Sequence, residues 1–179
     1  MAAAGAPLVV VMGVSGCGKT TLGRLLAQRL RAEFLEGDDL HPPRNVDRMA
    51  AGIPLTDDDR RDWLLAIAQQ LADARASQHG LVVSCSALKR SYRDVLRAAS
   101  ADLAFVHLDA GPELLESRLR GRTDHFMPAS LLASQLQTLE PPGATERAAT
   151  FDAALPATQI VEQAAQWLAH LPPLPKARR

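Results

Sequence analysis

A glycine-rich run near the start of the chain has the residue types and spacing of a phosphate-binding loop. The run reads Gly13-Val-Ser-Gly-Cys-Gly-Lys19-Thr20 and fits the pattern G-x-x-x-x-G-K-[ST]. Glycines allow the backbone to turn tightly, so that its N–H groups can point at phosphate oxygens. Lys19 is suited to bridge the β- and γ-phosphates, and the Thr20 hydroxyl is suited to ligate Mg²⁺. The predicted nucleotide site consists of Gly13, Val14, Ser15, Gly16, Cys17, Gly18, Lys19, Thr20 and Thr21.

The loop predicts nucleotide binding but leaves the reaction open. GTPases with this kind of loop usually carry an Asp-x-x-Gly switch and an Asn-Lys-x-Asp motif, and the sequence contains neither. A small-molecule kinase instead needs an acceptor pocket opposite the γ-phosphate and a basic segment that closes over the nucleotide. We therefore favour a kinase. A non-catalytic, nucleotide-dependent switch is the alternative from another class.

An acidic turn supplies the carboxylate that such an acceptor pocket needs. Glu36-Gly-Asp38-Asp39 follows the apolar run that predicts the second strand, which brings these acids to the edge of the sheet near the phosphate loop. Asp38 is the candidate that orients and deprotonates the attacking hydroxyl. Glu36 or Asp39 is expected nearer the water shell of the Mg²⁺ ion. An acidic turn that merely caps a helix is the alternative.

A basic segment later in the chain has the properties of a lid. Arg118, Arg120 and Arg122 follow one another at alternate positions. Arg118 and Arg122 are four residues apart and therefore share a helix face, and Gly121 offers a hinge between them. We predict a lid over about residues 118–130. A basic helix C-terminus that complements the helix dipole is the alternative.

Alternating strands and helices must position these groups. The apolar runs predict strands at Leu8–Met12, Glu33–Gly37, Leu81–Ser86, Leu103–Asp109 and Ala149–Ala153. The helical patterns cover Thr20–Arg31, Pro43–Ala51, Asp57–Ser77, Lys89–Ala99, Pro112–Arg120, Ser130–Leu139 and Ala157–Leu171. This order predicts an α/β fold with three layers, in which helices cover both faces of a five-stranded parallel sheet. Ligands of such sheets bind beyond the carboxyl ends of the strands.

Composition limits the class of protein. The 179 residues are 47% hydrophobic and 22% charged, which suits one globular domain, predicted over 1–171 with a flexible tail at 172–179. The net charge is zero, so we expect no nucleic-acid partner. Two cysteines and the lack of any long apolar stretch predict a cytoplasmic protein without a membrane partner. Only 3 of the 20 basic residues are Lys, and two of them, Lys19 and Lys89, fall at predicted sites.

Six segments resemble the gluconokinase family. They are GVSGCGKT, GDDLHPPRNVDRM, GIPLTDDDRRDWL, CSALKRSYRDVLR, HFMPASLL and QTLEPP, and they extend from Gly13 to about Pro142. The resemblance implies a P-loop kinase with an adenylate-kinase-like fold. It implies ATP and Mg²⁺ as cofactors, and phosphorylation of the 6-hydroxyl of D-gluconate in sugar-acid catabolism that feeds the pentose phosphate pathway. It also implies a homodimer, and Arg118 and Arg122 as the lid pair. A shikimate-kinase-like or nucleoside-monophosphate kinase is the second choice.

An acidic sugar needs cationic and polar partners, and the chain offers several. Lys89 and Arg93 are four residues apart and share one helix face beside the expected pocket. For each cation a solvated surface charge is the alternative, and for Arg60 and Arg93 an ion pair with a nearby Asp. The predicted substrate-binding residues are Asp38, His41, Arg48, Arg60, Lys89, Arg93 and His125. The predicted catalytic residues are Lys19, Asp38, Arg118 and Arg122, and the predicted metal-site residues are Thr20 and Glu36, the latter acting through water.

Overall fold

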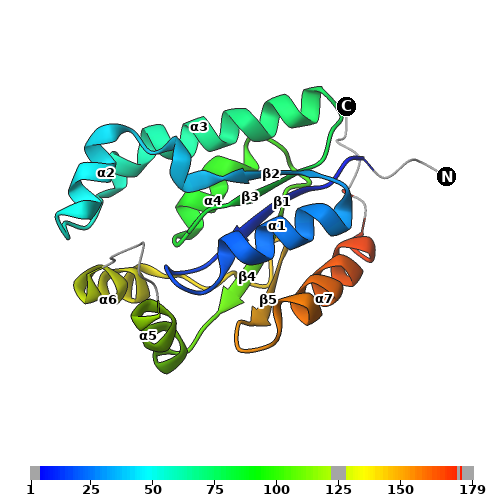
Figure 1. The fold of residues 1–179 in the computed structure, drawn as a ribbon. Helices are drawn as coiled ribbons and strands as arrows, with labels where there is room; N and C mark the ends of the chain where they lie inside the picture. The colour runs from blue at the N-terminus through cyan, green and yellow to red at the C-terminus, as the bar shows by residue number, and fades with distance from the viewer. Residues whose placement is uncertain (1–4, 122–127, 173, 175–179) are drawn as a thin grey trace.

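A sheet of five parallel strands forms the centre of the molecule (Figure 1). The computed structural model describes residues 5–121, 128–172 and 174. The strands are β1 (Leu8–Met12), β2 (Glu33–Glu36), β3 (Leu81–Ser84), β4 (Ala104–Asp109) and β5 (Ala148–Asp152), and their order across the sheet is β2-β3-β1-β4-β5. β1 therefore lies between β3 and β4, and the loop that follows it opens at the centre of the sheet edge.

Helices cover both faces of the sheet (Figure 1). They are α1 (Lys19–Leu30), α2 (Pro43–Ala50), α3 (Asp57–Ala76), α4 (Arg90–Arg97), α5 (Pro112–Arg120), α6 (Ala129–Thr138) and α7 (Ala157–Ala169), with a 3₁₀ helix η1 at Gly37–Leu40. α1 packs against α7 on one face, and α3 packs against α4 on the other. α2, α5 and α6 gather at the end toward which the strands run (Figure 1). The predicted three-layer α/β/α arrangement is confirmed.

The apolar content of the central strands explains why they are buried on both faces. β1 and β3 read LVVVM and LVVS, and every residue in them is buried. β-branched side chains fit a pleated strand, and a parallel sheet covered by helices needs no polar face. Trp63, Ile67 and Leu71 on α3 complete the core over one face of this sheet. The sheet is therefore a rigid base for the loops at its carboxyl edge.

Element boundaries differ from the predictions at two places that matter for the site. The second strand ends at Glu36, because Gly37 begins the 3₁₀ helix η1 instead of extending the strand. The helix predicted from Lys89 begins at Arg90, with extended backbone at Lys89. α3 begins with a reciprocal capping box formed by Thr56 and Asp59.

None of the helices in residues 5–121 and 128–172 combines the length and the hydropathy that a membrane crossing requires.

Candidate functional site

The phosphate loop connects β1 to α1 and wraps around the start of that helix. Gly16 and Gly18 have φ values of +82° and +105°, a region that residues with a Cβ rarely adopt. These angles turn successive N–H groups inward and create a concave, anion-binding surface at the N-terminus of α1. Lys19 Nζ donates to the carbonyl of Val14 at 3.0 Å, which folds its side chain back across the loop. The loop therefore has the shape that its sequence predicts.

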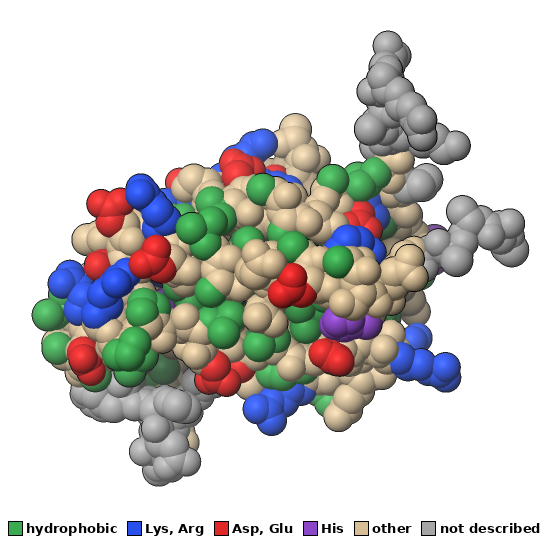
Figure 2. Space-filling view, turned by 90° about the horizontal axis from the view of Figure 1, so that it is seen from above, with side chains coloured by type: hydrophobic (Ala, Val, Ile, Leu, Met, Phe, Trp, Pro, Cys, Tyr) green, Lys and Arg blue, Asp and Glu red, His purple; other side chains and the backbone are tan. Residues whose placement is uncertain are grey.

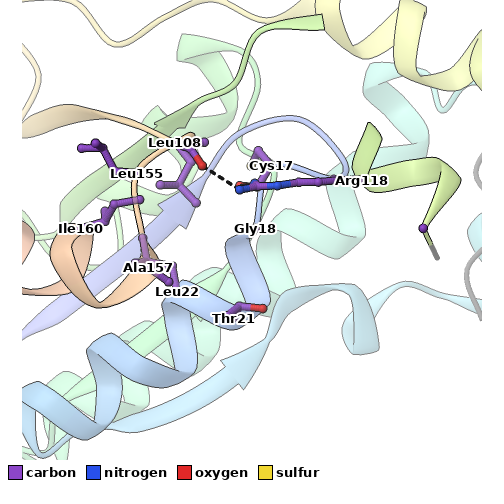
Figure 3. A pocket seen from close by; sticks show the side chains of 12 residues that line it. Cys17, Gly18, Thr21, Leu22, Leu108, Arg118, Leu155, Ala157 and Ile160 are labelled. Atoms are coloured by element: carbon purple, nitrogen blue, oxygen red, sulfur yellow. Dashed lines mark hydrogen bonds between the residues drawn. The ribbon is translucent and has the colours of Figure 1, made fainter. Parts of the chain in front are cut away.

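A cavity of about 350 Å³ lies against one side of this loop, a size typical of small-molecule sites. Part of its wall is apolar, with Leu108 from β4, Leu155 from the loop after β5, and Ile160 from α7 (Figure 3). The opposite part is polar and comes from the phosphate loop and Thr21 on α1. An apolar wall beside a phosphate-binding surface suits a purine base joined to phosphates. The loop after β5 could not be predicted as part of the site, because Leu155 and Ile160 belong to ordinary apolar patterns.

Arg118 reaches from α5 into this cavity (Figure 3). Its Nη1 donates to the carbonyl of Cys17 in the phosphate loop, and its Nη2 donates to the carbonyl of Ala153 after β5, both at 2.7 Å. The side chain thus joins the loop to the far wall of the cavity. Arg122 and His125 lie in residues 122–127 of the predicted lid, which are outside the described residues. Their assigned roles remain predictions.

Thr20 and Glu36 meet at the end of β2, where the Mg²⁺ ion was predicted. Thr20 Oγ1 donates to Glu36 Oε2 at 2.5 Å, and Ser84 Oγ donates to the other carboxylate oxygen of Glu36. These groups present only oxygen atoms, the ligand type that Mg²⁺ prefers. Protein sites for Mg²⁺ usually supply one or two oxygens and leave the rest to water and phosphate. The donor set therefore fits the ion.

A second, smaller cavity lies on the other side of Lys19, under η1 and α6. Asp38 on η1 and His41 directly after it form one part of the wall, and Arg60 on α3 forms another. Lys19 lines this cavity, so it lies within reach of both the predicted phosphates and a second ligand. The full wall consists of Ser15, Lys19, Asp38, His41, Met49, Pro54, Leu55, Arg60, Ser86, Leu131, Ser134 and Gln135.

The position of Asp38 depends on Gly37, which is buried against β3. A Cβ on Gly37 would lie 2.1 Å from the carbonyl oxygen of Ser84, a contact that no side chain could make. Two hydrogen bonds hold the residue there: its N–H donates to Ser84 Oγ at 3.3 Å, and its carbonyl accepts from Trp63 Nε1 at 2.7 Å. η1 is thus fixed to the sheet at one end and presents the largely exposed Asp38 carboxylate to the cavity.

Arg60 is the cation best placed for an anionic ligand in the second cavity. Its guanidinium lies over the Tyr92 ring, with Cζ 5.6 Å from the ring centroid. Its Nε is buried and has no hydrogen-bond partner among the described residues. The ion pair with the acids at the start of α3, which was the alternative role for Arg60, does not appear among its described contacts. Burial lowers the pKa of the neighbouring His41 to about 4, and the charge of Arg60 adds to this shift.

The wall of the second cavity does not include three other predicted substrate residues, Lys89, Arg48 and Arg93. Lys89 Nζ binds both carboxylate oxygens of Asp57, at 2.9 and 3.1 Å. The carboxylate of Asp57 also accepts from the hydroxyl of Tyr92. Arg48 is half-exposed, with Nε 3.4 Å from Asp59 Oδ2. Roles for Lys89 and Arg48 in substrate binding remain predictions. Each side chain already pairs with a carboxylate of this protein and would have to exchange it for the substrate.

The prediction for Arg93 is wrong. Its side chain is only 1% exposed, and its guanidinium forms two hydrogen bonds, of 2.8 and 2.9 Å, with Glu146. It also donates to the carbonyls of Ala87 and Leu88. Helical spacing puts Arg93 and Lys89 on the same helix face. The Lys89 side chain lies at the protein surface, whereas that of Arg93 lies in the protein interior. The residue supports the loop before α4 and does not reach a ligand cavity.

Two residues that sequence reasoning missed contribute to the site or its frame. Gln135 on α6 lines the second cavity, and its Oε1 accepts from the N–H of Ser15 in the phosphate loop at 2.7 Å. Glu146 is buried between Arg93 and Arg97. A lone Gln in a helix and a lone Glu in a loop carry no spacing signal, so only their tertiary contacts reveal them.

Comparison with known proteins agrees with this geometry. The family model described as "AAA domain" matches residues 8–142. The gluconokinase of Gluconobacter oxydans is 54% identical over 138 residues, covering 77% of this chain and 78% of that protein. The crystal structure of a gluconokinase from Sinorhizobium meliloti is 51% identical, with a TM-score of 0.83 and coverage of 91% of each chain.

A more distant structure shares the fold alone. Shikimate kinase from Bacteroides thetaiotaomicron superposes with a TM-score of 0.67 over 91% of this chain and 98% of the other, at 18% identity. The three-layer architecture is thus common to several kinases, whereas the high identities are to gluconokinases. The chain belongs to the gluconokinase family, within the P-loop proteins that the matching family model covers.

Proposed function

We propose that this protein transfers the γ-phosphoryl group of ATP to the 6-hydroxyl of D-gluconate, giving 6-phospho-D-gluconate and ADP. The observation that carries the proposal is the position of Lys19, which lies in the phosphate loop and also lines the cavity of Asp38 and Arg60. A nucleotide along α1 and an acceptor beside Asp38 would therefore meet at Lys19. That arrangement is the one that in-line phosphoryl transfer requires.

Each residue of the site has its own role in the phosphoryl transfer. Asp38 orients the acceptor hydroxyl and receives its proton as the oxygen attacks phosphorus. Lys19 and the phosphate-loop N–H groups stabilise the charge on the transferring phosphoryl oxygens. Arg118 lies beside Cys17 in the nucleotide cavity, from which its guanidinium can exchange a carbonyl partner for phosphate. Arg122, as the second cation of the predicted lid, would act on the same phosphates.

The charge of Arg60 favours an acid over a neutral sugar as the ligand of the second cavity. A buried guanidinium nitrogen without a partner among the described residues favours an anionic ligand, since an unpaired buried donor is costly. The gluconate carboxylate is such a ligand, and a carboxylate–guanidinium pair is both strong and directional. Shikimate and nucleoside monophosphates are also anions, so the charge alone does not select gluconate. The family membership favours gluconate among them.

Mg²⁺ is the metal that this proposal includes. Thr20 Oγ1 would ligate it directly, and Glu36 would hold a water molecule of its shell. When bound, the ion neutralises charge on the β- and γ-phosphates. We also propose that the protein is a homodimer, from the family resemblance, and that it is cytoplasmic, from its two cysteines and the lack of a long apolar stretch. Sedimentation or size-exclusion chromatography coupled to light scattering measures the oligomeric state directly.

The acceptor assignment is tested with Asp38→Asn, and Asp47→Asn, at an exposed position of α2, serves as the matched control. Loss of the base should reduce kcat by at least about 100-fold, because a general base typically contributes 10²–10⁴-fold. The dissociation constant for ATP should stay within about twofold of the wild-type value. Near-normal turnover by the Asp38 variant would contradict the assignment. The same assay run with gluconate, shikimate and nucleoside monophosphates identifies the acceptor.

A further inference from the structure

His41 is held in place by two neighbours that lie outside the phosphate-transfer machinery. Its ring stacks on the indole of Trp63, with centroids 4.0 Å apart and planes inclined by 16°. On its edge, Nδ1 lies 3.2 Å from Nδ2 of Asn45 on α2. The side chain is only 3% exposed, and its Nε2 lies 3.9 Å from Asp38 Oδ1 at the wall of the second cavity. The ring therefore has a fixed plane and a fixed edge toward Asp38.

Asn45 determines which ring nitrogen carries the proton. Asn45 is fully buried, and its Nδ2 donates to the main-chain carbonyl of Asp59 at 2.8 Å. Rotating the amide by 180° would bring Oδ1 against that carbonyl, where two acceptors would repel each other. The NH₂ group must therefore face Asp59, and its second hydrogen is directed at Nδ1 of His41. Since Nδ1 accepts this hydrogen bond, the proton of the neutral ring lies on Nε2.

The charged groups around the ring come from three elements. Asp38 faces Nε2 from η1, and Arg60 on α3 and Lys19 on α1 line the same cavity. Burial lowers the pKa of the ring, and the charge of Arg60 adds to this, so the ring stays neutral. A neutral ring with its proton on Nε2 is a hydrogen-bond donor at the acceptor cavity. It adds no charge to compete with Arg60 for a carboxylate.

We propose that Asn45 is a positioning residue for the acceptor: it holds His41 as the tautomer protonated on Nε2, so that this N–H donates to an oxygen of the sugar acid beside Asp38. The inference rests on the proposed function, because it takes a polyhydroxy acid as the ligand of the second cavity. Asn45 itself touches no ligand. It sets the direction of the hydrogen bond between His41 and the acceptor, and acceptor affinity depends on that bond. Asn45 acts through His41 alone, and this restriction makes the proposal testable.

A double-mutant cycle on Asn45 and His41 measures this dependence. Asn45→Ala should raise KM for gluconate about tenfold, as expected for one lost hydrogen bond, and leave KM for ATP within about twofold. His41→Ala should have a similar effect, and adding Asn45→Ala to it should change KM by less than about twofold. Arg44→Ala is the matched control on α2, because Arg44 pairs with Asp62 at the surface and lines neither cavity described above. It should leave both KM values unchanged.

A spectroscopic readout separates positioning from general support of α2. In ¹⁵N-edited NMR spectra of the ligand-free protein, His41 should show the Nε2–H tautomer. Asn45→Asp keeps the shape of the side chain but replaces the donor with an acceptor, and should move a proton to Nδ1. This measurement needs no activity, so it stays informative even if gluconate is the wrong substrate.

Three outcomes would overturn the inference. One is an Nδ1–H tautomer in the wild-type protein. Another is an effect of Asn45→Ala on KM that persists in full when His41 is already Ala, because Asn45 would then act on the structure of α2. The third is wild-type KM for gluconate in both single variants. Failure of the proposed function is distinct, since the wild-type protein itself would then not phosphorylate gluconate.

Discussion

At the scale of single residues, the phosphate loop is held by side chains that are not part of its motif. Gln135 accepts the N–H of Ser15, and Arg118 donates to the carbonyl of Cys17. One contact comes from α6 and the other from α5. The loop is therefore connected to both cavity walls, and small shifts of α5 or α6 would reach the phosphate-binding surface directly.

Replacing Gln135 tests the importance of this connection. Gln135→Leu leaves the N–H of Ser15 without its side-chain acceptor and removes a polar group from the acceptor cavity. We expect kcat/KM for gluconate to fall about tenfold, which corresponds to one hydrogen bond of about 1.4 kcal/mol. Steady-state kinetics with each substrate varied in turn measures this change. Gln137→Leu, at an exposed position of the same helix, is the control and should change kcat/KM less than twofold. Equal effects of the two substitutions would show that the contact has no functional role.

At the scale of elements, a buried ionic cluster joins α4 to the loop before β5. Glu146 accepts from Arg93 and Arg97 on α4, and from the N–H of Gly143 in its own loop. Arg93 extends the connection to the carbonyls of Ala87 and Leu88, so it also fixes the loop that follows β3. Ser86 of that loop lines the acceptor cavity. The cluster thus stabilises one wall of the site from behind.

Breaking this cluster should destabilise the protein strongly. Glu146→Gln leaves the buried Arg93 without its counter-charge, and we expect the free energy of unfolding to fall by about 3–5 kcal/mol. Urea unfolding followed by circular dichroism measures the change. Glu162→Gln, which removes the exposed pair with Arg29, is the control and should lower the free energy of unfolding by at most about 1 kcal/mol. A loss of that small size in Glu146→Gln would mean that the cluster is not structurally important.

Acid should weaken the same cluster. Burial alone would raise the pKa of Glu146, but hydrogen bonds from Arg93 and Arg97 outweigh it and lower the pKa from 4.5 to about 2. Because the folded state lowers this pKa, the ionised carboxylate stabilises the protein fully above about pH 4.5 and loses this effect as the pH falls toward 2. The stability difference between the wild type and Glu146→Gln should therefore shrink across this range. A difference that stays constant from pH 6 to pH 3 would contradict this assignment.

At the scale of the whole molecule, charge is balanced and function depends on local cavities. Figure 2 shows acidic and basic side chains interspersed over the face that carries α3. The net charge of zero is consistent with this mixture. Long-range attraction of anionic substrates is therefore weak, and their recognition rests on Lys19, Arg60 and the N-terminus of α1 at short range.

Nucleotide binding should stabilise the whole fold, since the phosphate loop is attached to the central strand. At a concentration 100 times the dissociation constant, a ligand adds about 2.7 kcal/mol of stability. For a chain of this size that corresponds to a rise in Tm of about 5–10 °C. Differential scanning fluorimetry with a non-hydrolysable ATP analogue and Mg²⁺ measures it. Lys19→Met should lose most of the rise, whereas Asp38→Asn should keep it. A full rise in the Lys19 variant would remove Lys19 from the phosphate site.

Prediction from sequence succeeded where chemistry or periodicity repeats in a recognisable pattern. The buried strands and the phosphate loop each have a local signature, and the structure contains both. The wrong assignment of Arg93 has a physical cause, because helical spacing gives a face but not what packs against it. Gln135 and Glu146 contact residues 120 and 53 positions away in the chain, and the amide orientation of Asn45 is set by a carbonyl 14 positions away. No local pattern encodes such contacts.

The contact between Gly37 and β3 has an evolutionary consequence. The position of the Asp38 carboxylate depends on the absence of a Cβ at Gly37. Any side chain at Gly37 would collide with the Ser84 carbonyl and push η1 off the sheet. Substrate preference can still diverge at Arg60, His41 or α6, which contribute side chains to the wall of the cavity. New acceptor specificities in this lineage should therefore arise from substitutions in the cavity wall, while position 37 remains glycine.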